Sequence, residues 1–248
     1  MKTPILLFSS ALLACSCSHT EEHKSQLERA ADQLSESGGT EAPQAKAVVE
    51  SFKGSRGWSF DDLAPGAVPA GWKIEATNAG DQPASWATVA AADAPSGGQV
   101  MGLEDTRGAT GQTYNLLWSD DLAFRDGVIE LAVQAGSGVE DQGGGPAWRM
   151  RDKDNYYVAR WNPLEDNFRV YYVYDGRRGQ LASAEVDLDP GTWHTIRIEH
   201  VGGLIRCSLD GEELLKVSDT THLDPGGVGL WTKADAATRF DDLFVVGS

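Results

Sequence analysis

The sequence predicts an all-β protein folded as a two-sheet antiparallel jelly-roll sandwich. Short apolar segments of strand length recur along the chain after Gly54, and turn signals that contain glycine or proline separate them. None of these segments keeps the helical apolar period of 3.6 residues. No repeat of about 20–50 residues is present, which disfavours a propeller or a solenoid. A sandwich or jelly roll is the architecture that remains.

Eight segments carry the strand pattern most clearly. In chain order they are Thr113–Ser119, Gly127–Gln134, Ala147–Arg151, Asn155–Trp161, Phe168–Tyr174, Thr192–Val201, Leu204–Leu209 and Val228–Thr232. Turn residues follow several of these segments, as in Asn162-Pro163, Asp175-Gly176, Gly202-Gly203, Asp210-Gly211 and Pro225-Gly226-Gly227. Successive side chains of a strand point to opposite sides, so parity indicates which residues face the core.

The composition argues against a nucleic acid as a partner. The 248 residues carry a formal net charge of -16, whereas a phosphate backbone binds to a basic surface. Three cysteines provide no disulfide framework. In the Leu204–Leu209 segment, Cys207 shares a side with Ile205 and Leu209, so we interpret it as a buried apolar residue rather than a nucleophile.

The N-terminus has the features of an export signal. Lys2 precedes an apolar run that is too short to span a bilayer, since spanning needs about 20 residues. Leu12-Leu13-Ala14-Cys15 resembles a lipobox, so residues 1–15 are predicted to be a lipoprotein signal with Cys15 lipidated; ordinary secretion is the alternative. Residues 16–53 are mostly polar, and His19–Gly39 contains no aromatic residue, which predicts a disordered tether. The folded domain is expected over 54–248, held at the periplasmic or cell-surface face of the envelope.

Several motifs carry a family resemblance. They are Trp58–Leu63 with Pro69–Trp72, Gly191–Ile198, Ile205–Gly211, Gly226–Thr232 and Arg239–Val245. Their order resembles the concanavalin A-like lectin/glucanase superfamily, which includes laminin G-like modules. Within it, the chain is most similar to bacterial domains described as 3-keto-disaccharide hydrolases or glycoside hydrolase family 16-like domains. The resemblance implies a jelly roll and a carbohydrate ligand.

The resemblance implies catalysis less clearly. Family 16 glucanases carry Glu-x-Asp-x-x-Glu, because two carboxylates must flank the sugar about 5–5.5 Å apart. The nearest match begins at Glu185, and Pro190 occupies the position of the second glutamate. Gln142–Arg149 resembles the glycine-rich turn and arginine of the keto-disaccharide group, but the following strand lacks an acid. Glu165 and Asp141 are the remaining catalytic candidates.

Three arginines on successive predicted strands indicate a ligand face. Parity places Arg149 and Arg151 opposite Trp148 and Met150, and the polar sides of the next two strands carry Arg160 and Arg169. Guanidinium groups donate paired hydrogen bonds to vicinal hydroxyls, and aromatic rings stack on sugars. The further candidates for this groove are Gln142, Tyr156 or Tyr157, Asn162, Glu165, Asn167, Tyr171, Trp231 and Lys233. The alternative is that these arginines form salt bridges on a solvated sheet.

Doubled acids near both ends of the domain suggest a metal. Asp241 resembles the calcium-binding aspartate of the superfamily, and Asp61 is its expected partner in a structural Ca²⁺ site. The alternative is that these acids face solvent or cap turns. No organic cofactor is expected.

The sequence therefore predicts a monomeric, membrane-tethered carbohydrate-binding domain outside the cytoplasm. Two alternatives stay open: a glycan-processing hydrolase of the 3-keto-disaccharide type, and a protein-interaction module of laminin G type.

Overall fold

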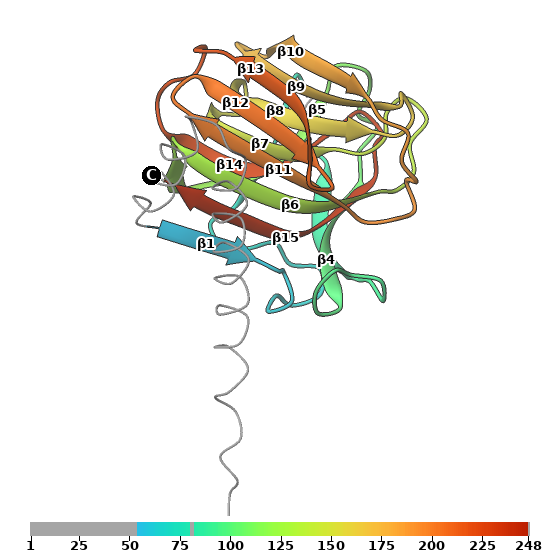
Figure 1. Ribbon diagram of the computed structural model, residues 1–248. Helices are drawn as coiled ribbons and strands as arrows, with labels where there is room; N and C mark the ends of the chain where they lie inside the picture. Colours follow the sequence, from blue (N-terminus) through green and yellow to red (C-terminus); the bar gives the residue numbers. More distant parts are fainter. Residues whose placement is uncertain (1–53, 80–81, 248) are drawn as a thin grey trace, which may run out of the picture. The chain divides into compact units, whose positions relative to one another are not determined.

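The structure, a computed structural model, describes residues 54–79 and 82–247. These residues form fifteen strands and no helix (Figure 1). The strands are β1 (Gly54–Trp58), β2 (Lys73–Thr77), β3 (Ser85–Ala90), β4 (Gln99–Asp105), β5 (Tyr114–Phe124), β6 (Gly127–Ala135), β7 (Gly145–Asp152), β8 (Asn155–Asn162), β9 (Asn167–Tyr174), β10 (Arg177–Glu185), β11 (His194–Val201), β12 (Leu204–Leu209), β13 (Glu212–Ser218), β14 (Gly226–Lys233) and β15 (Thr238–Gly247). The described part of the chain thus contains no helix able to cross a membrane.

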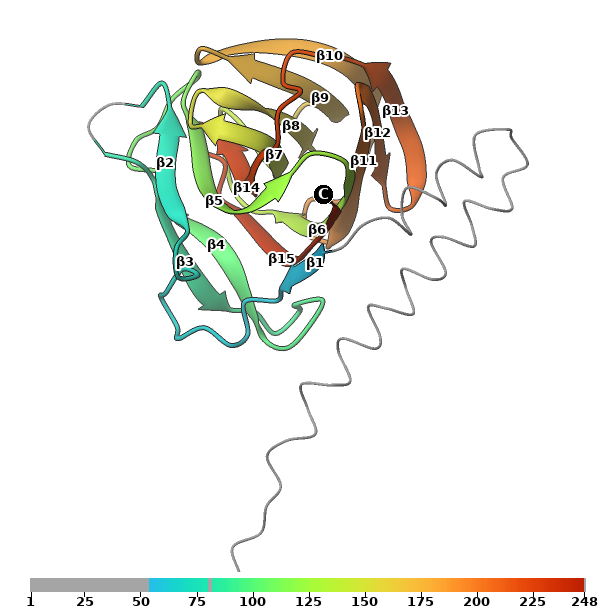
Figure 2. The ribbon, with the colours of Figure 1, turned by 90° about the vertical axis from the view of Figure 1, so that its left-hand side faces the viewer.

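The strands form two antiparallel sheets. The eight-stranded sheet has the order β13-β12-β11-β6-β15-β4-β3, with β1 also paired to β15, and the seven-stranded sheet has the order β10-β9-β8-β7-β14-β5-β2. At one edge of the sandwich β10 contacts β13, whereas β2 and β3 are the terminal strands at the other edge (Figure 2). The predicted fold class, an all-β two-sheet sandwich, is confirmed.

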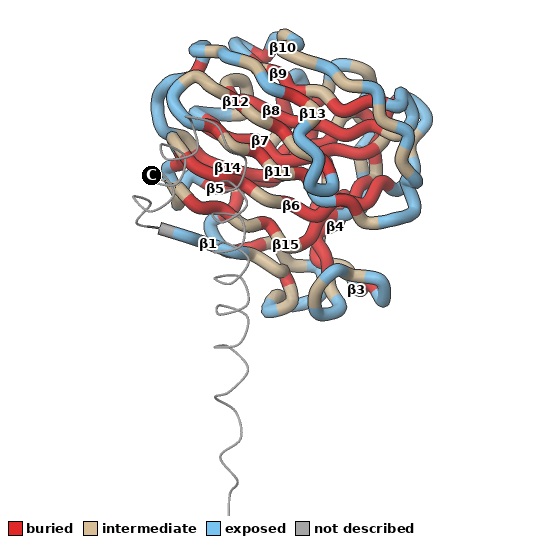
Figure 3. Tube along the Cα trace, viewed as in Figure 1, coloured by how far each residue is buried: buried red, intermediate tan, exposed pale blue. Residues whose placement is uncertain are grey.

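The main core lies between the two sheets. Trp148 and Trp161 from the seven-stranded sheet pack in one cluster with Ile196 and Phe240 from the eight-stranded sheet. Burying one such side chain stabilises the fold by about 1.5–3 kcal/mol relative to leaving it exposed. Figure 3 shows the buried residues concentrated in the central strands and the exposed ones in the turns.

All eight predicted strands are present, with bounds shifted by a few residues. Parity holds on β12, where Cys207 is fully buried and burial raises the pKa of its thiol. Parity fails on β7: Trp148 lies in the main core, but Met150 lies in a second cluster on the other side of the sheet. The reason is a β-bulge on this strand, where Arg149 adopts a φ of 47° and resets the alternation.

The second cluster covers the outer face of the seven-stranded sheet. Its members are Tyr114, Leu116, Trp118, Ala147, Met150, Tyr156, Val158, Tyr171, Val173 and Trp231. The end of β2 closes over this face, because Thr77 Oγ1 donates a hydrogen bond to Lys153 O and Asn78 Nδ2 donates one to Gly176 O. The aromatic residues that the sequence suggests as a ligand-binding face therefore pack largely against one another.

Candidate functional site

Four charged side chains lie at one end of this outer face and contact one another. We call them the charged ladder: Asp141, Arg160, Glu165 and Arg169. Arg160 on β8 and Arg169 on β9 are directly opposite in the strand register, whereas the sequence predicted only that they share one side of the sheet. Arg160 Nη1 donates to both carboxylate oxygens of Asp141 at 3.1 Å, and its Nη2 donates to Glu165 Oε2 at 2.8 Å. Arg169 Nη1 reaches the same Glu165 oxygen at 2.9 Å.

One half of this ladder is closed to solvent. Asp141 and Asn162 are both 0% exposed, and Arg160 is 1% exposed. Asp141 also accepts hydrogen bonds from Lys233 Nζ at 2.6 Å and from Asn162 Nδ2 at 3.1 Å. The expectation that Arg160, Asn162 and Lys233 line an open groove is wrong, because each supplies a donor to a carboxylate that must be paired when buried.

The other half is accessible. The side chains of Glu165 and Arg169 are 42% and 31% exposed. Burial raises the pKa of Glu165, but the hydrogen bond from Asn167 and the charges of Arg160 and Arg169 outweigh this effect, so the pKa is lowered overall. Glu165 therefore stays ionised and accepts hydrogen bonds over a wide pH range.

Neither catalytic candidate is placed as a proton donor. Asp141 has no exposed surface and is enclosed by three donor side chains. A general acid needs a raised pKa, whereas that of Glu165 is lowered. Both carboxylates contact one guanidinium group, that of Arg160, which makes them structural partners.

Arg178, which the sequence analysis did not select, lies over three aromatic rings of the outer face. The Arg178 guanidinium carbon lies 4.2 Å from the ring centre of Tyr171, 5.3 Å from Tyr114 and 5.8 Å from Trp231. The three rings are at most 3% exposed, so the predicted ligand residues Tyr171 and Trp231 are not open stacking platforms. The signal was present in the hairpin Asp175-Gly176-Arg177-Arg178, which puts an arginine on this face of β10.

Arg149 belongs to another part of the molecule. It is 1% exposed and donates to three backbone carbonyls: Arg125 O at 2.8 Å, His222 O at 2.8 Å and Gly202 O at 2.9 Å. The expectation that it shares a face with Arg160 and Arg169 is wrong, because the β7 bulge turns it towards these loops.

Tyr157 and Gln142 are also placed differently from the expectation. Tyr157 is 0% exposed and packs in the main core, where its hydroxyl donates to Asp219 Oδ1; its neighbour Tyr156 is the one on the outer face. Burial, more than the bond to Asp219, raises the pKa of Tyr157. Gln142 is half-buried and donates to Gly138 O, within its own loop.

The two predicted calcium ligands converge on one loop, residues 96–99. Asp241 is 0% exposed and accepts hydrogen bonds from Ser96 N at 3.2 Å and Asp242 N at 2.8 Å. Asp61 Oδ1 accepts from Gly98 N at 2.9 Å. Burial, followed by the charge of Asp242, raises the pKa of Asp241 to about 7.

A calcium site needs more oxygen ligands than these two acids present. Calcium takes six to eight oxygen ligands, at about 2.3–2.6 Å. The described residues contain no group of three or more His, Cys, Asp or Glu side chains that is arranged to hold an ion. The carboxylates of Asp61 and Asp241 point at N–H groups, so the ligand set is incomplete as it stands.

Comparisons with known proteins bear on the fold. No family model matches this chain, and no curated protein matches its sequence. The carbohydrate-binding module CBM66 from Bacillus subtilis is similar at 17% identity and a TM-score of 0.54, over 70% of this chain and 93% of the module. The cellulose-induced protein Cip1 matches at 14% identity and a TM-score of 0.56, over 78% of this chain and 97% of that protein.

A third structure completes the comparison. A Bacillus licheniformis beta-glucanase is similar at 11% identity and a TM-score of 0.53, covering 79% of this chain and 98% of the glucanase. Identities this low show the fold alone. The domain therefore has a concanavalin A-like jelly-roll fold, shared with carbohydrate-binding modules and glucanases.

Proposed function

We propose that this domain binds carbohydrate at the exposed end of the charged ladder, around Glu165 and Arg169. The proposal rests on the hydrogen bonds that the carboxylate of Glu165 accepts. Arg160, Asn167 and Arg169 all donate to its Oε2, so within the described part of the chain Oε1 remains open to a ligand. A carboxylate fixed in this way is preorganised to accept hydrogen bonds from sugar hydroxyls.

The surroundings supply the other contacts that a sugar needs. Arg169 is part-exposed and presents donors beside the free oxygen of Glu165. Leu164 is 46% exposed next to Glu165 and offers an apolar contact for the C–H groups of a pyranose. The structural neighbours that are named as a carbohydrate-binding module and a glucanase give the same ligand class on this fold.

Glycan-array binding by the full chain tests the proposal. Arg169→Ala and Glu165→Gln should each weaken binding about tenfold or more, since a charge-assisted hydrogen bond contributes about 1.5–3 kcal/mol. Arg177→Ala is the matched control, because Arg177 is exposed at the start of the neighbouring strand β10. Binding that survives both site variants would place the ligand elsewhere.

The same samples test the hydrolase alternative. Release of reducing sugar by the wild type that is lost in Glu165→Gln would identify an enzyme, including one of the 3-keto-disaccharide type. Binding without release supports the carbohydrate-binding domain.

Membrane tethering is a separate proposal. Cys15 and the predicted tether lie outside the described residues, and the support is the lipobox-like sequence Leu12–Cys15. Expressed in a Gram-negative host, the full chain should fractionate with membranes, and Cys15→Ala should release it. Wild-type protein found entirely in the soluble periplasmic extract would contradict lipidation.

A further inference from the structure

Arg178 is a half-buried cation that has no acceptor among the described residues. Its Nη1 is enclosed without a hydrogen bond, but the side chain as a whole is only half-buried, so solvent and ligands can reach its other N–H groups. Every other buried or half-buried arginine of the described chain donates to at least one acceptor; these are Arg149, Arg160, Arg169, Arg197 and Arg206. A guanidinium group is always charged, and losing water without gaining an acceptor costs free energy. Arg178 therefore indicates that a ligand supplies the acceptor.

The aromatic cluster of the outer face fixes the position of this group. The guanidinium carbon lies 4.2 Å from the ring centre of Tyr171, 5.3 Å from that of Tyr114 and 5.8 Å from that of Trp231. The faces of these rings attract the cation, but they do not replace a hydrogen-bond acceptor for its N–H groups. A guanidinium fork held in this way is preorganised to donate paired hydrogen bonds to a carboxylate or another oxyanion.

Arg178 lies beside the proposed carbohydrate site. It is opposite Val173 in the register of β9 and β10, and Val173 and Tyr171 both belong to the outer face. Tyr171 is two residues from Arg169 on the same face of β9, which corresponds to about 7 Å along the strand. Because Arg178 lies over the Tyr171 ring, one ligand can contact both Arg178 and Arg169.

The local charge at this end of the outer face is positive. The charged ladder and Lys233 together contain three cations and two carboxylates, all in contact with one another. Arg178 adds a fourth cation. Glu185, the carboxylate at the far end of β10, is seven residues from Arg178, or about 20 Å along the strand, whereas salt screens charges beyond about 8 Å. The chain as a whole is acidic, but the charges closest to a ligand here favour an anion.

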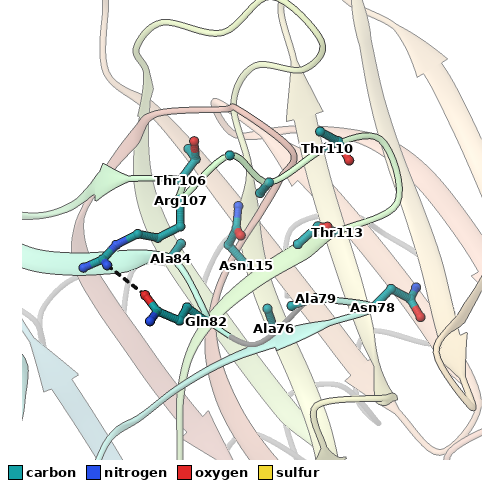
Figure 4. Close-up of a pocket in the computed structure, with 12 residues that line it drawn as sticks. Ala76, Asn78, Ala79, Gln82, Ala84, Thr106, Arg107, Thr110, Thr113 and Asn115 are labelled. Atoms are coloured by element: carbon teal, nitrogen blue, oxygen red, sulfur yellow. Dashed lines mark hydrogen bonds between the residues drawn. The ribbon is translucent and has the colours of Figure 1, made fainter.

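The pocket shown in Figure 4 has no comparable group. It has a volume of about 610 Å³, and Arg107 is the one charged side chain among its described lining residues. Arg107 donates to Gln82 Oε1 at 3.1 Å, as Figure 4 shows, and pairs with Asp105 at 3.1 Å. An arginine with two partners of its own requires no ligand, which distinguishes Arg107 from Arg178.

We propose that the carbohydrate bound at Glu165 and Arg169 is an acidic sugar, and that Arg178 donates hydrogen bonds to its carboxylate or sulfate group. This inference rests on the proposed function, because it names the class of ligand for the same site. Glu165 and Arg169 contact the hydroxyls of the sugar, and Arg178 distinguishes the acidic form from its neutral counterpart.

The test compares matched acidic and neutral sugars, with binding to the full chain measured by calorimetry. Trigalacturonate is paired with its methyl ester, and a sulfated carrageenan tetrasaccharide with its desulfated form, which separates carboxylate from sulfate recognition. At least one acidic sugar should bind about tenfold more tightly than its neutral counterpart. Arg178→Gln should reduce this ratio to about twofold or less and leave binding of the neutral sugar unchanged. Arg178→Lys keeps a positive charge over the rings but loses the planar fork, so it should reduce the ratio by about threefold or more.

Arg177→Ala is the matched control. Arg177 is the exposed neighbour of Arg178, and its side chain alternates to the other face of β10, so removing its charge should leave the ratio unchanged. Melting temperatures establish that each variant folds, and Arg178→Lys provides the test if Arg178→Gln does not.

The two proposals fail in different measurements. The absence of any preference for an acidic sugar, a ratio that persists in the folded Arg178 variants, or an equal fall of the ratio in Arg177→Ala would each overturn the role of Arg178. Binding of the neutral sugar that is unchanged in Arg169→Ala would instead contradict the proposed function.

Discussion

Arg160 and Arg169 face each other across β8 and β9, and their guanidinium groups share one acceptor, Oε2 of Glu165, at 2.8 and 2.9 Å. Two like charges directly opposite on a sheet destabilise it unless an opposite charge lies between them. Glu165 provides that charge from the β8–β9 turn. The same residue therefore stabilises the sheet end and forms the proposed ligand site.

Removing this charge should lower stability. Glu165→Gln leaves Asp141 as the one carboxylate that contacts the buried Arg160 among the described residues, and it removes the counter-charge between the two arginines. We therefore expect a loss of about 1–2 kcal/mol in the free energy of unfolding. Urea denaturation measures it. Glu185→Gln, at an exposed position at the end of β10, is the control and should change stability by less than about 0.5 kcal/mol. An unchanged midpoint for Glu165→Gln would show that the ladder contributes nothing.

Arg149 should be required for folding stability rather than for binding. Arg149→Lys cannot reach all three carbonyls with one ammonium group, which leaves buried acceptors without donors and costs about 2–4 kcal/mol. Thermal melting measures this loss, and Arg151→Lys, an exposed neighbour, is the control. Weakened glycan binding with unchanged melting would restore Arg149 to the ligand face.

Asp241 should make the domain less stable as the pH rises. Its folded-state pKa of about 7 lies above the ordinary value of 3.8, so the folded state binds more protons than the unfolded state between pH 4 and 7. The stabilisation from protonated Asp241 is complete below pH 4 and is lost through pH 7. Asp241→Asn removes this loss and should raise stability at pH 8 by at least about 1 kcal/mol. Equal pH slopes for the two proteins between pH 5 and 8 would contradict this prediction.

Calcium bound at Asp241 would instead stabilise the domain at high pH. An ion bound only by the folded state raises stability by mass action. If Ca²⁺ completes its ligand set at Asp61 and Asp241, chelator should lower the melting temperature at pH 8, and Asp241→Asn should abolish that sensitivity. Identical melting curves with Ca²⁺ and with chelator would leave Asp241 as an uncompensated buried acid.

His200 should contribute to acid unfolding. Burial, together with the charge of Arg149, lowers the pKa of His200 to about 3, so this side chain is neutral in the folded state. In the unfolded state it gains a proton as the pH falls through about 6.5. Its contribution to stability is present above pH 6.5 and is lost as the pH falls towards 3. His200→Gln keeps an acceptor for Trp148 Nε1 and should reduce the stability lost between pH 7 and 4.5. An identical loss in both proteins would assign acid unfolding to other groups.

The order and type of the strands could be predicted from the sequence because they depend on local patterns. The alternation of Ile205, Cys207 and Leu209, and the glycine turns between strands, are decided by neighbouring residues. The register that brings Arg160 opposite Arg169 follows from one short hairpin, so this pair was also predictable.

Features that depend on distant segments were decided by the tertiary structure. The bulge at Arg149 depends on how β7 pairs with β14, which begins at Gly226, and a single extra residue there reverses parity. The burial of Arg160 depends on Asp141 and Lys233, which come from outside its hairpin. The sequence by itself determined an all-β sandwich and the composition of its faces. Only the folded chain decided which polar residues are enclosed and which reach solvent, because enclosure is set by packing between elements far apart in sequence.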